Sequence, residues 1–283
     1  MKLALFSPAK INLFFRVLKK RPDGYHEIAS LYQSISLGDR LEIELAHEDR
    51  LECDDETLPC DSTNLILRAA DLFRRKTGKK VYAHFHLLKR TPIQAGLGGG
   101  SSNAATALWG LNQLSGKAVS NEELMLWSAE LGSDVPFFFS TGTAYCEGRG
   151  EKILPLPPLP KRQKFWIAKP QGGLSTPLVY QETKPELLEE RDPKTALRSF
   201  TEGSPLYFND LEPAAFRLAS PLSSFKNQLY KAGFDQVVMT GSGTAFICFG
   251  EGRAPPEMEG VRFFSAHFLQ KREEEWYEFP SFC

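Results

Sequence analysis

The chain has 283 residues, of which 42% are hydrophobic and 24% charged, and its formal net charge is -1. This length and composition are typical of a globular protein with room for two domains. A net charge near zero argues against nucleic-acid binding by phosphate neutralisation, and no apolar run approaches the length of a membrane span. We therefore expect neither a nucleic acid nor a membrane as partner, and we expect a monomer or a weak homodimer.

The cysteines are odd in number, scattered along the chain and without metal-binding spacing: Cys53, Cys60, Cys146, Cys248 and Cys283. We expect reduced thiols, as in a cytoplasmic protein. The first five residues are too few for the apolar region of a secretion signal, and Pro8 and Lys10 follow soon after.

The first informative stretch, residues 7–17, predicts a strand with one buried face. Every second residue there is apolar: Ile11, Leu13, Phe15 and Val17. On this interpretation Lys10 and Asn12 lie together on the opposite face. The pattern leaves open whether that face meets solvent or a ligand, because lysine and asparagine are usually exposed.

A tight turn follows, since Asp23-Gly24 is a strong hairpin signal. Tyr25 and His26 come directly after this turn, where an aromatic ring could stack on a base. Simple packing of Tyr25 in a hairpin explains the same residues, and the residues alone favour that explanation.

Alternating residues predict two more strands, at 41–45 and 81–87, separated by an acidic loop and a helix. The helix follows a Ser or Thr cap near residue 62 and ends at Gly78. His84 and His86 share one face of the second strand, but no third ligand accompanies them, so we expect them to be polar surface residues.

The centre of the chain is a glycine-rich loop between a strand and a helix. Four glycines and two serines lie between Gly96 and Ser102, and the helix is predicted from Asn103 to Leu114. Glycine lets the backbone approach a ligand, and a helix start offers unpaired N–H groups and a positive dipole end. The loop therefore predicts a phosphate site rather than a tight turn with a serine cap. It is not a Walker-type loop, because Gly-Lys-Ser/Thr is absent, and it lacks the third glycine of the dinucleotide fingerprint.

A capping box at 120–123 opens a helix predicted to end at Leu131, before Gly132. Asp134 follows this helix. It could cap a short helix that has Pro136 in its first turn, or it could present a carboxylate that accepts a proton from a substrate hydroxyl.

Four prolines between residues 155 and 160 predict a stiff linker. We place the domain boundary there, with an N-terminal domain at 1–154, a linker at 155–162 and a C-terminal domain at 163–283. The second domain is predicted to contain a strand at 165–168, an irregular region at 177–205, helices at 212–220 and 222–232, and strands at 237–239 and 245–249. The last two strands flank a second glycine-hydroxyl loop, 240–244, which by itself indicates only a hairpin turn.

Taken together, these motifs resemble the GHMP superfamily of small-molecule kinases. The resemblance rests on segments that occur in order: Pro8–Leu13, Asp23–His26, Gly96–Ala105, Asp134–Pro136, Asn209–Glu212 and Thr240–Gly243. Gln94-Ala95 stands where more glycine is common and Ser133 where alanine is common, but neither departure removes a functional group. The resemblance implies an α+β fold with two lobes, an N-terminal ATP lobe related to a ribosomal-protein-like fold and a C-terminal ferredoxin-like lobe.

The resemblance also implies an activity. Lys10 and Asn12 with Tyr25 and His26 point to members that phosphorylate the 2-hydroxyl of a cytidine-diphosphate-linked methylerythritol, in the non-mevalonate route to isoprenoid precursors. ATP and Mg²⁺ are the implied cofactors, and the acceptor hydroxyl would lie between Lys10 and Asp134, the catalytic pair.

The implied binding residues fall into three groups. ATP would contact Pro92, Ile93, Gln94, Ala95, Gly96, Leu97, Gly98, Gly99, Gly100, Ser101 and Ser102 with its phosphates, and Asn64, Leu65 and Ile66 with its adenine. The small-molecule acceptor would contact Asn12, Tyr25, His26, Thr240, Gly241 and Ser242. The hydroxyl of Ser102 could add a ligand to the metal.

Two other interpretations stay open. Another member of the superfamily, acting on homoserine, mevalonate or a sugar, would have no use for Tyr25 and His26 as a base-binding pair. A nucleotide-binding module without catalysis would not need the carboxylate of Asp134 facing Lys10.

Overall fold

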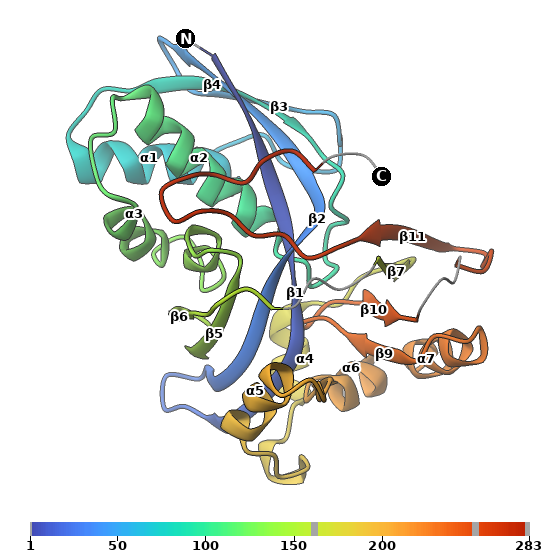
Figure 1. Ribbon diagram of the computed structural model, residues 1–283. Helices are drawn as coiled ribbons and strands as arrows, with labels where there is room; N and C mark the ends of the chain where they lie inside the picture. Colours follow the sequence, from blue (N-terminus) through green and yellow to red (C-terminus); the bar gives the residue numbers. More distant parts are fainter. Residues whose placement is uncertain (1, 160–163, 251–254, 281–283) are drawn as a thin grey trace.

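Two long antiparallel strands, β1 (Lys2–Lys20) and β2 (His26–Ala46), extend from the first lobe of the molecule alongside the second (Figure 1). The computed structural model describes residues 2–159, 164–250 and 255–280. Each lobe is built on one β-sheet, and the turn between β1 and β2 lies at the level of the second lobe's helices.

The sheet of the first lobe has seven strands among the described residues, in the order β3-β4-β2-β1-β8, with β5 paired to β2 and to β6. The bounds of the remaining strands are β3 (Arg50–Cys53), β4 (Tyr82–Leu88), β5 (Thr143–Gly148), β6 (Lys152–Pro155) and β8 (Phe208–Asn209). Because β8 pairs in parallel with β1, this sheet includes strands from both halves of the chain.

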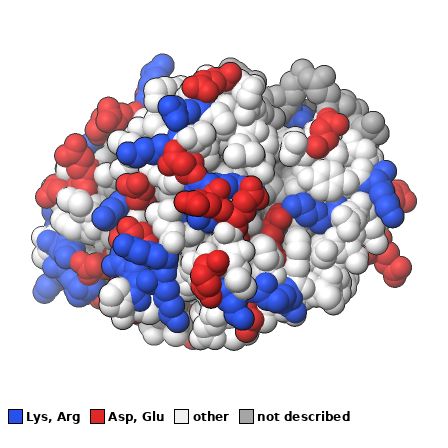
Figure 2. All heavy atoms as spheres, turned by 90° about the horizontal axis from the view of Figure 1, so that it is seen from below, with Lys and Arg blue, Asp and Glu red and all other residues white. Residues whose placement is uncertain are grey.

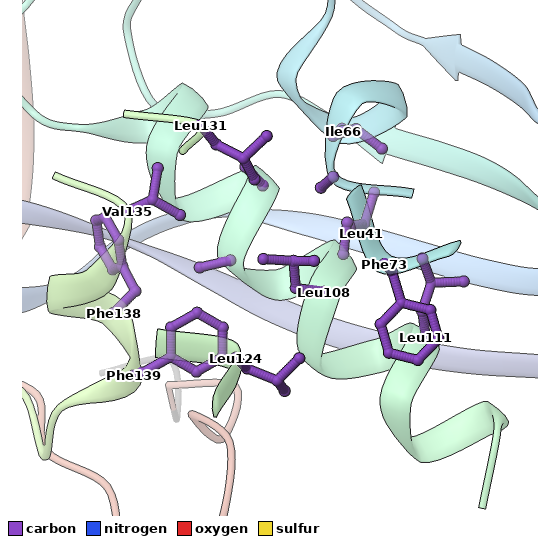
Figure 3. Packing of buried hydrophobic residues seen from close by; sticks show 14 of the residues in the cluster. Leu41, Ile66, Phe73, Leu108, Leu111, Leu124, Leu131, Val135, Phe138 and Phe139 are labelled. Atoms are coloured by element: carbon purple, nitrogen blue, oxygen red, sulfur yellow. The ribbon is translucent and has the colours of Figure 1, made fainter. Parts of the chain in front are cut away.

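One layer of helices packs against this sheet. Its members are α1 (Leu65–Thr77), α2 (Gly99–Leu114), α3 (Asn121–Ser128) and the short 3-10 helix η1 (Pro136–Phe139). Apolar side chains of the helices and strands form one buried cluster, which includes Leu41, Phe73 and Leu108 (Figure 3). This cluster fixes α2, the helix that follows the glycine loop.

The second lobe has a four-stranded antiparallel sheet in the order β11-β7-β10-β9. Its strands are β7 (Phe165–Pro170), β9 (Gln236–Met239), β10 (Phe246–Phe249) and β11 (Val261–Ala266). Its helices are α4 (Thr176–Glu182), the 3-10 helix η2 (Pro185–Leu187), α5 (Pro193–Thr201), α6 (Glu212–Leu218) and α7 (Pro221–Lys231).

The two lobes share a hydrophobic core. Ile11 and Leu13 of β1 are buried in one cluster with Ile167 and Ile247 of the second sheet. The C-terminal segment also returns to the first lobe, where Trp276 Nε1 donates to the carbonyl oxygen of Phe6 at 2.8 Å.

The division into domains at 1–154 and 163–283 stays a prediction. Residues 160–162 of the predicted linker lie outside the described residues, and Leu156 and Leu159 pack against the shared core.

β1 differs from the simple alternation predicted for it. A register shift between Asn12 and Phe14 interrupts the pairing with β2. As a result Ile11 and Leu13 face the core between the lobes, whereas Phe15 and Val17 pack with the helices of the second lobe. Both faces of β1 are covered at its centre, so the face with Lys10 and Asn12 does not meet bulk solvent.

Several local predictions need correction. Asn64, rather than a serine or threonine, caps α1, since its Oδ1 accepts from the amide of Ile66 at 3.0 Å. The predicted capping box of α3 is confirmed, but this helix ends at Ser128 rather than Leu131. Strands β3, β5, β6, β8 and β11 and helices α4 and α5 were not predicted, because they are short or lie in segments rich in charged residues and proline. Strand β2 was predicted only at 41–45, and it extends back to His26.

The surface and the cysteines agree with the composition. On the face seen in Figure 2, acidic and basic side chains are interspersed rather than separated. The cysteines in the described part of the chain are free thiols, and the prediction for Cys283 falls outside it. None of the described helices is long and apolar enough to cross a membrane.

Candidate active site

A cavity of about 900 Å³ lies between the two lobes. The glycine loop, residues 92–101, forms one wall. Tyr25, directly before β2, and His26, the first residue of β2, lie at the other end. Thr176 and Tyr180 of α4 and the second glycine loop complete the lining, so both lobes contribute to one cavity.

The glycine loop has a backbone that only glycine adopts easily. Gly96 and Gly98 have positive φ angles of 78° and 65°. A Cβ atom on Gly96 would lie 1.9 Å from the carbonyl oxygen of Thr240, and one on Gly98 would lie 3.0 Å from Cγ of Lys10. Side chains at these positions would therefore separate the loop from Lys10 and from the second lobe.

The start of α2 offers free amide groups to the cavity. Gly98 is the N-cap, and the first helical bond runs from the amide of Ser102 to the carbonyl of Gly98 at 2.9 Å. The amides of residues 99–101 consequently have no acceptor within the helix. Together with the helix dipole, they make an anion site. The helix begins four residues before the predicted Asn103, and Gly98 takes the cap position, which excludes the serine-capped turn.

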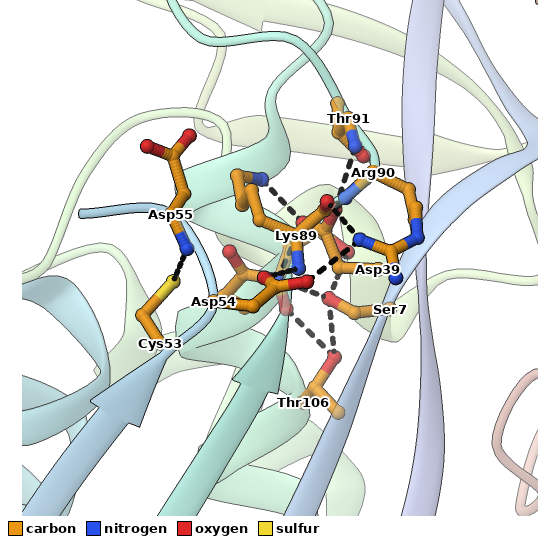
Figure 4. Close-up of polar contacts among 11 residues, drawn as sticks. Ser7, Asp39, Cys53, Asp54, Asp55, Lys89, Arg90, Thr91 and Thr106 are labelled. Carbon is orange, nitrogen blue, oxygen red and sulfur yellow. Dashed lines mark hydrogen bonds and ion pairs between the residues drawn. The ribbon is translucent and has the colours of Figure 1, made fainter. Parts of the chain in front are cut away.

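A buried carboxylate that the sequence analysis missed fixes both ends of the loop (Figure 4). Asp39 is almost fully buried and forms an ion pair with Lys89. Its oxygens also accept from the amide of Thr91 at 2.7 Å, before the loop, and from Nδ2 of Asn103 at 2.9 Å, after it. No sequence pattern marks Asp39, since its partners are 50 or more residues away.

The predicted role of Ser102 in metal binding needs correction. Its side chain is completely buried, does not line the cavity, and accepts a hydrogen bond from the hydroxyl of Ser7 at 2.9 Å. The hydroxyl therefore belongs to the packing of α2 on β1, and only Ser101 reaches the cavity lining.

Lys10 and Asp134 meet at the middle of the cavity. Nζ of Lys10 donates to Oδ1 of Asn12 at 2.8 Å and lies 3.5 Å from Oδ2 of Asp134. The Lys10 side chain is only 4% exposed, whereas that of Asp134 is 31% exposed. Asp134 makes no capping bond, because Val135 occupies the N-cap position of η1. The carboxylate is thus presented to the cavity beside a buried ammonium group.

Tyr32 of β2 connects this pair. Its hydroxyl donates to Oδ1 of Asp134 at 3.1 Å, and Nζ of Lys10 lies 4.7 Å from the centre of its ring. Burial first, and then the charge of Asp134, raise the pKa of the Tyr32 hydroxyl well above its ordinary value. The hydroxyl therefore stays protonated and available as a donor.

Comparisons with known proteins agree with this geometry. Residues 64–142 match the family described as GHMP kinases N terminal domain. The 4-diphosphocytidyl-2-C-methyl-D-erythritol kinase of Protochlamydia amoebophila is 51% identical over 97% of this chain and 93% of its own length. The chloroplastic enzyme of the same name from Arabidopsis thaliana is 42% identical over 99% of this chain and 77% of its own.

The chain belongs to the 4-diphosphocytidyl-2-C-methyl-D-erythritol kinase family. A crystal structure of 4-(cytidine 5'-diphospho)-2C-methyl-D-erythritol kinase superimposes with a TM-score of 0.80 at 34% identity, covering 95% of this chain and all of that one. The predicted two-lobed α+β GHMP kinase fold is therefore confirmed. The chain is an ATP-dependent phosphotransferase with an alcohol group as acceptor.

The far end of the cavity is aromatic. Tyr25 is 55% exposed, and the ring of Tyr180 lies 5.3 Å from that of His26. His26 is 6% exposed, and none of the described residues hydrogen-bonds its Nε2. Burial, with Lys20 nearby, lowers the pKa of His26, which favours the neutral ring. Tyr180 lies in the irregular region 177–205, where the sequence analysis assigned no site residue.

A cation lies next to this aromatic end. The guanidinium group of Arg149, in the turn between β5 and β6, lies 5.0 Å from the centre of the Tyr25 ring and lines the cavity. Its Nε is 3.9 Å from the carboxylate of Glu151, which is a loose ion pair. Nothing in the residue pattern predicted a role for Arg149.

The predicted adenine residues divide into two groups. Asn64 and Leu65 line the cavity together with Leu58 and Pro59, which were not predicted. Ile66 faces the opposite way, since it is buried in the core beneath α1 (Figure 3). Ile66 therefore does not reach the cavity in which adenine is predicted to bind.

The predicted acceptor-binding residues at the second glycine loop and on β1 also fall into two groups. Gly241 and Ser242 line the cavity, and their contact with the acceptor stays a prediction. Thr240 is completely buried, and its hydroxyl accepts from the amide of Asn12 at 3.0 Å. Asn12 is likewise buried and does not line the cavity. These two residues hold the site in place, because Asn12 accepts from Lys10 and Thr240 contacts the carbonyl oxygen of Gly96.

Proposed function

We propose that this chain transfers the γ-phosphoryl group of ATP to the 2-hydroxyl of 4-diphosphocytidyl-2-C-methyl-D-erythritol. One observation carries the proposal: Lys10 and Asp134 lie 3.5 Å apart between a phosphate-binding helix start and an aromatic pocket in a single cavity. The names of the relatives support the same acceptor.

ATP would bind with its phosphates against the amides of residues 99–101. These amides and the dipole of α2 stabilise negative charge without moving. The adenine would lie against Leu58, Pro59 and Leu65, the apolar residues at that end of the cavity. Lys89 lines the same wall, and its pairing with Asp39 holds the strand that leads into the loop.

The cytosine of the acceptor would stack between the rings of Tyr25 and Tyr180. Stacking on an aromatic ring explains why a large side chain such as Tyr25 is left 55% exposed beside a cavity. The unpartnered Nε2 of His26 supplies a hydrogen-bonding atom for the polar edge of the base.

The diphosphate of the acceptor lies, in its covalent structure, between the cytidine and the methylerythritol. Arg149 has the matching position, because it contacts Tyr25 and is followed by Gly150, which packs against Tyr32 and Asp134. A guanidinium group at this point pairs well with phosphate oxygens. A base pocket, a cation and the Lys10–Asp134 pair in one cavity would thus suit an acceptor that carries a nucleotide.

In the reaction, the acceptor oxygen forms a bond to Pγ as the bond from Pγ to the β-phosphate oxygen breaks, and ADP leaves. Asp134 takes the proton of the 2-hydroxyl, and the ammonium group of Lys10 offsets negative charge on the transferring group. Most of the acceleration comes from holding the two reactants in line.

Magnesium fits this site through the nucleotide. Among the described residues, no group of three or more His, Cys, Asp or Glu side chains could hold a metal ion. Mg²⁺ readily binds phosphate oxygens and water, and Ser101 offers one hydroxyl on the cavity lining. When bound, the metal would neutralise charge on the ATP phosphates.

The test is turnover of ATP with magnesium, with and without the cytidylated methylerythritol, and in parallel with homoserine and mevalonate. We expect turnover with the cytidylated acceptor and none with homoserine or mevalonate. Turnover with homoserine or mevalonate instead would keep the phosphate loop and reject the cytosine pocket. ATP binding without turnover on any of these acceptors would favour the nucleotide-binding module.

A further inference from the structure

Tyr32 lies where the two charged groups of the site meet. It pairs with Asn12 across β1 and β2, so it stands next to Lys10 in the sheet. Only 2% of its surface is exposed, yet it contributes to the cavity lining. Tyr32 lies in the part of β2 before residue 41, where neither a strand nor a site residue was predicted.

The ring of Tyr32 supports the ammonium group of Lys10. Nζ of Lys10 lies 4.7 Å from the ring centre, within the range of a cation–π contact, and the pair is shielded from water. The ring is itself held by Phe137, which meets it edge-on at 5.3 Å. Because Phe137 belongs to the short helix that follows Asp134, the ring packs against the segment that carries the carboxylate.

The hydroxyl of Tyr32 occupies one oxygen of Asp134. It donates to Oδ1 at 3.1 Å, while Oδ2 faces Lys10 at 3.5 Å. Gly150, with a φ of 113°, packs over the same side: a Cβ atom there would lie 3.0 Å from the Tyr32 hydroxyl and 3.6 Å from Oδ1. The two carboxylate oxygens are therefore in different surroundings.

We propose that Tyr32 is a positioning residue that leaves Oδ2 of Asp134 as the proton acceptor and holds Lys10 beside it. A carboxylate turns easily about its last torsion, which is broad and two-fold. The hydrogen bond to Oδ1 removes this freedom, so Oδ2, beside Lys10, keeps one direction towards the acceptor hydroxyl. The identity of that acceptor rests on the proposed function, whereas the contact of Tyr32 with Asp134 does not.

The experiment is a double-mutant cycle in the full chain. Tyr32→Phe removes the hydroxyl and keeps the ring, so we expect kcat to fall roughly tenfold, with KM for ATP and for the acceptor within about twofold of the parent values. In an Asp134→Asn background the same change should cause no further loss, because the hydroxyl acts through that carboxylate. The proposal would be overturned if the loss of kcat in the double variant equalled the product of the two single losses. It would also be overturned if kcat were unchanged in Tyr32→Phe alone.

The matched control is Tyr277→Phe. Tyr277 is also a buried tyrosine whose hydroxyl has one side-chain partner, Ser34 at 2.9 Å, and it lies outside the cavity lining. We expect its kcat to stay within about twofold of the parent value. A tenfold loss in this control would mean that losing any buried tyrosine hydroxyl lowers kcat. The positioning role of Tyr32 would then be rejected.

A second measurement needs no substrate. In protein labelled with ¹³C at the tyrosine ring carbon that carries the hydroxyl, the signal that disappears in Tyr32→Phe belongs to Tyr32. This signal should move in Asp134→Asn and stay in place in Asp71→Asn, a change on the exposed face of α1. An unmoved signal would show that the hydrogen bond is absent.

If the parent protein turns over a different alcohol, the double-mutant cycle is run with that alcohol. Failure of the acceptor assignment is then distinguished from failure of this proposal.

Discussion

The two ends of the cavity are built from different parts of the chain. At the phosphate end the glycine loop brings its main chain to the cavity, packed so closely at Gly96 that a side chain would overlap the second lobe. At the base end side chains form the lining, with Tyr25 half exposed and Arg149 held by a loose ion pair and by its contact with the Tyr25 ring. A main-chain surface suits a group shared by every nucleoside triphosphate. A side-chain surface can change residue by residue without changing the fold, and we therefore expect it to set the choice of acceptor.

The largest effect is expected at Asp134, which lies between the two ends of the cavity. Asp134→Asn keeps the size of the side chain and removes the proton acceptor, so we expect kcat to fall by about 10²–10⁴ while ATP binds as before. Steady-state kinetics and calorimetric titration with ATP measure the two quantities. Asp71→Asn serves as the control at an exposed aspartate. Near-normal turnover in Asp134→Asn would exclude this residue as the base.

Next in size is a change at the phosphate end, Gly96→Ala. The added Cβ would meet the carbonyl oxygen of Thr240 at 1.9 Å, so the loop must move, and we expect KM for ATP to rise by about tenfold or more. Gly78→Ala is the matched control, because Gly78 has a similar φ of 68° and open space around it. If both variants lose only stability, measured as Tm, and keep KM for ATP, the close packing of the loop has no role in nucleotide binding.

An effect confined to one substrate is expected at the base end. Tyr25→Ala removes a stacking ring, worth about 1–3 kcal/mol per base, so KM for the cytidylated acceptor should rise by about 5- to 150-fold. KM for ATP should change by less than about twofold. Tyr25→Phe keeps the ring and should behave as the parent protein. Equal rises of both KM values in Tyr25→Ala would argue against base stacking.

The smallest effect is expected at Arg149. The change to Ala removes a half-exposed cation, so we expect a rise of about threefold to tenfold in KM for the acceptor, shrinking as salt is added. The change to Lys should recover part of the loss, since it keeps the charge without the planar fork. A rise in KM that is the same at low and high salt would mean that Arg149 acts by packing on Tyr25.

Local patterns in the sequence predicted the parts of the site made by neighbouring residues. The glycine loop, the strand with Lys10 and the hairpin before Tyr25 all depend on residues within a few positions of one another. Resemblance to a kinase superfamily then joined Lys10 to Asp134. The structure places these two side chains 3.5 Å apart, and their catalytic roles stay a prediction. It leaves Ile66, Ser102, Asn12 and Thr240 outside the cavity lining.

The parts that were missed depend on contacts between distant residues. Asp39 is recognisable only from its four donors near residues 90 and 103. Tyr32 needs its partner Asp134, which lies 102 residues later. Tyr180 lies on a seven-residue helix inside a segment without clear periodicity. Charge, burial and pairing at such positions are set by the fold, so composition and spacing do not reveal them.

The core shared by the two sheets limits how this molecule moves. Opening the cavity by rotating one lobe away from the other would expose Ile11 and Leu13 together with Ile167 and Ile247. Burial of this apolar surface couples the lobes, so they should melt together, as one peak in a calorimetric scan rather than two. Substrates would then enter through adjustments of α4 and of side chains such as Tyr25, while the framework around Lys10 stays closed.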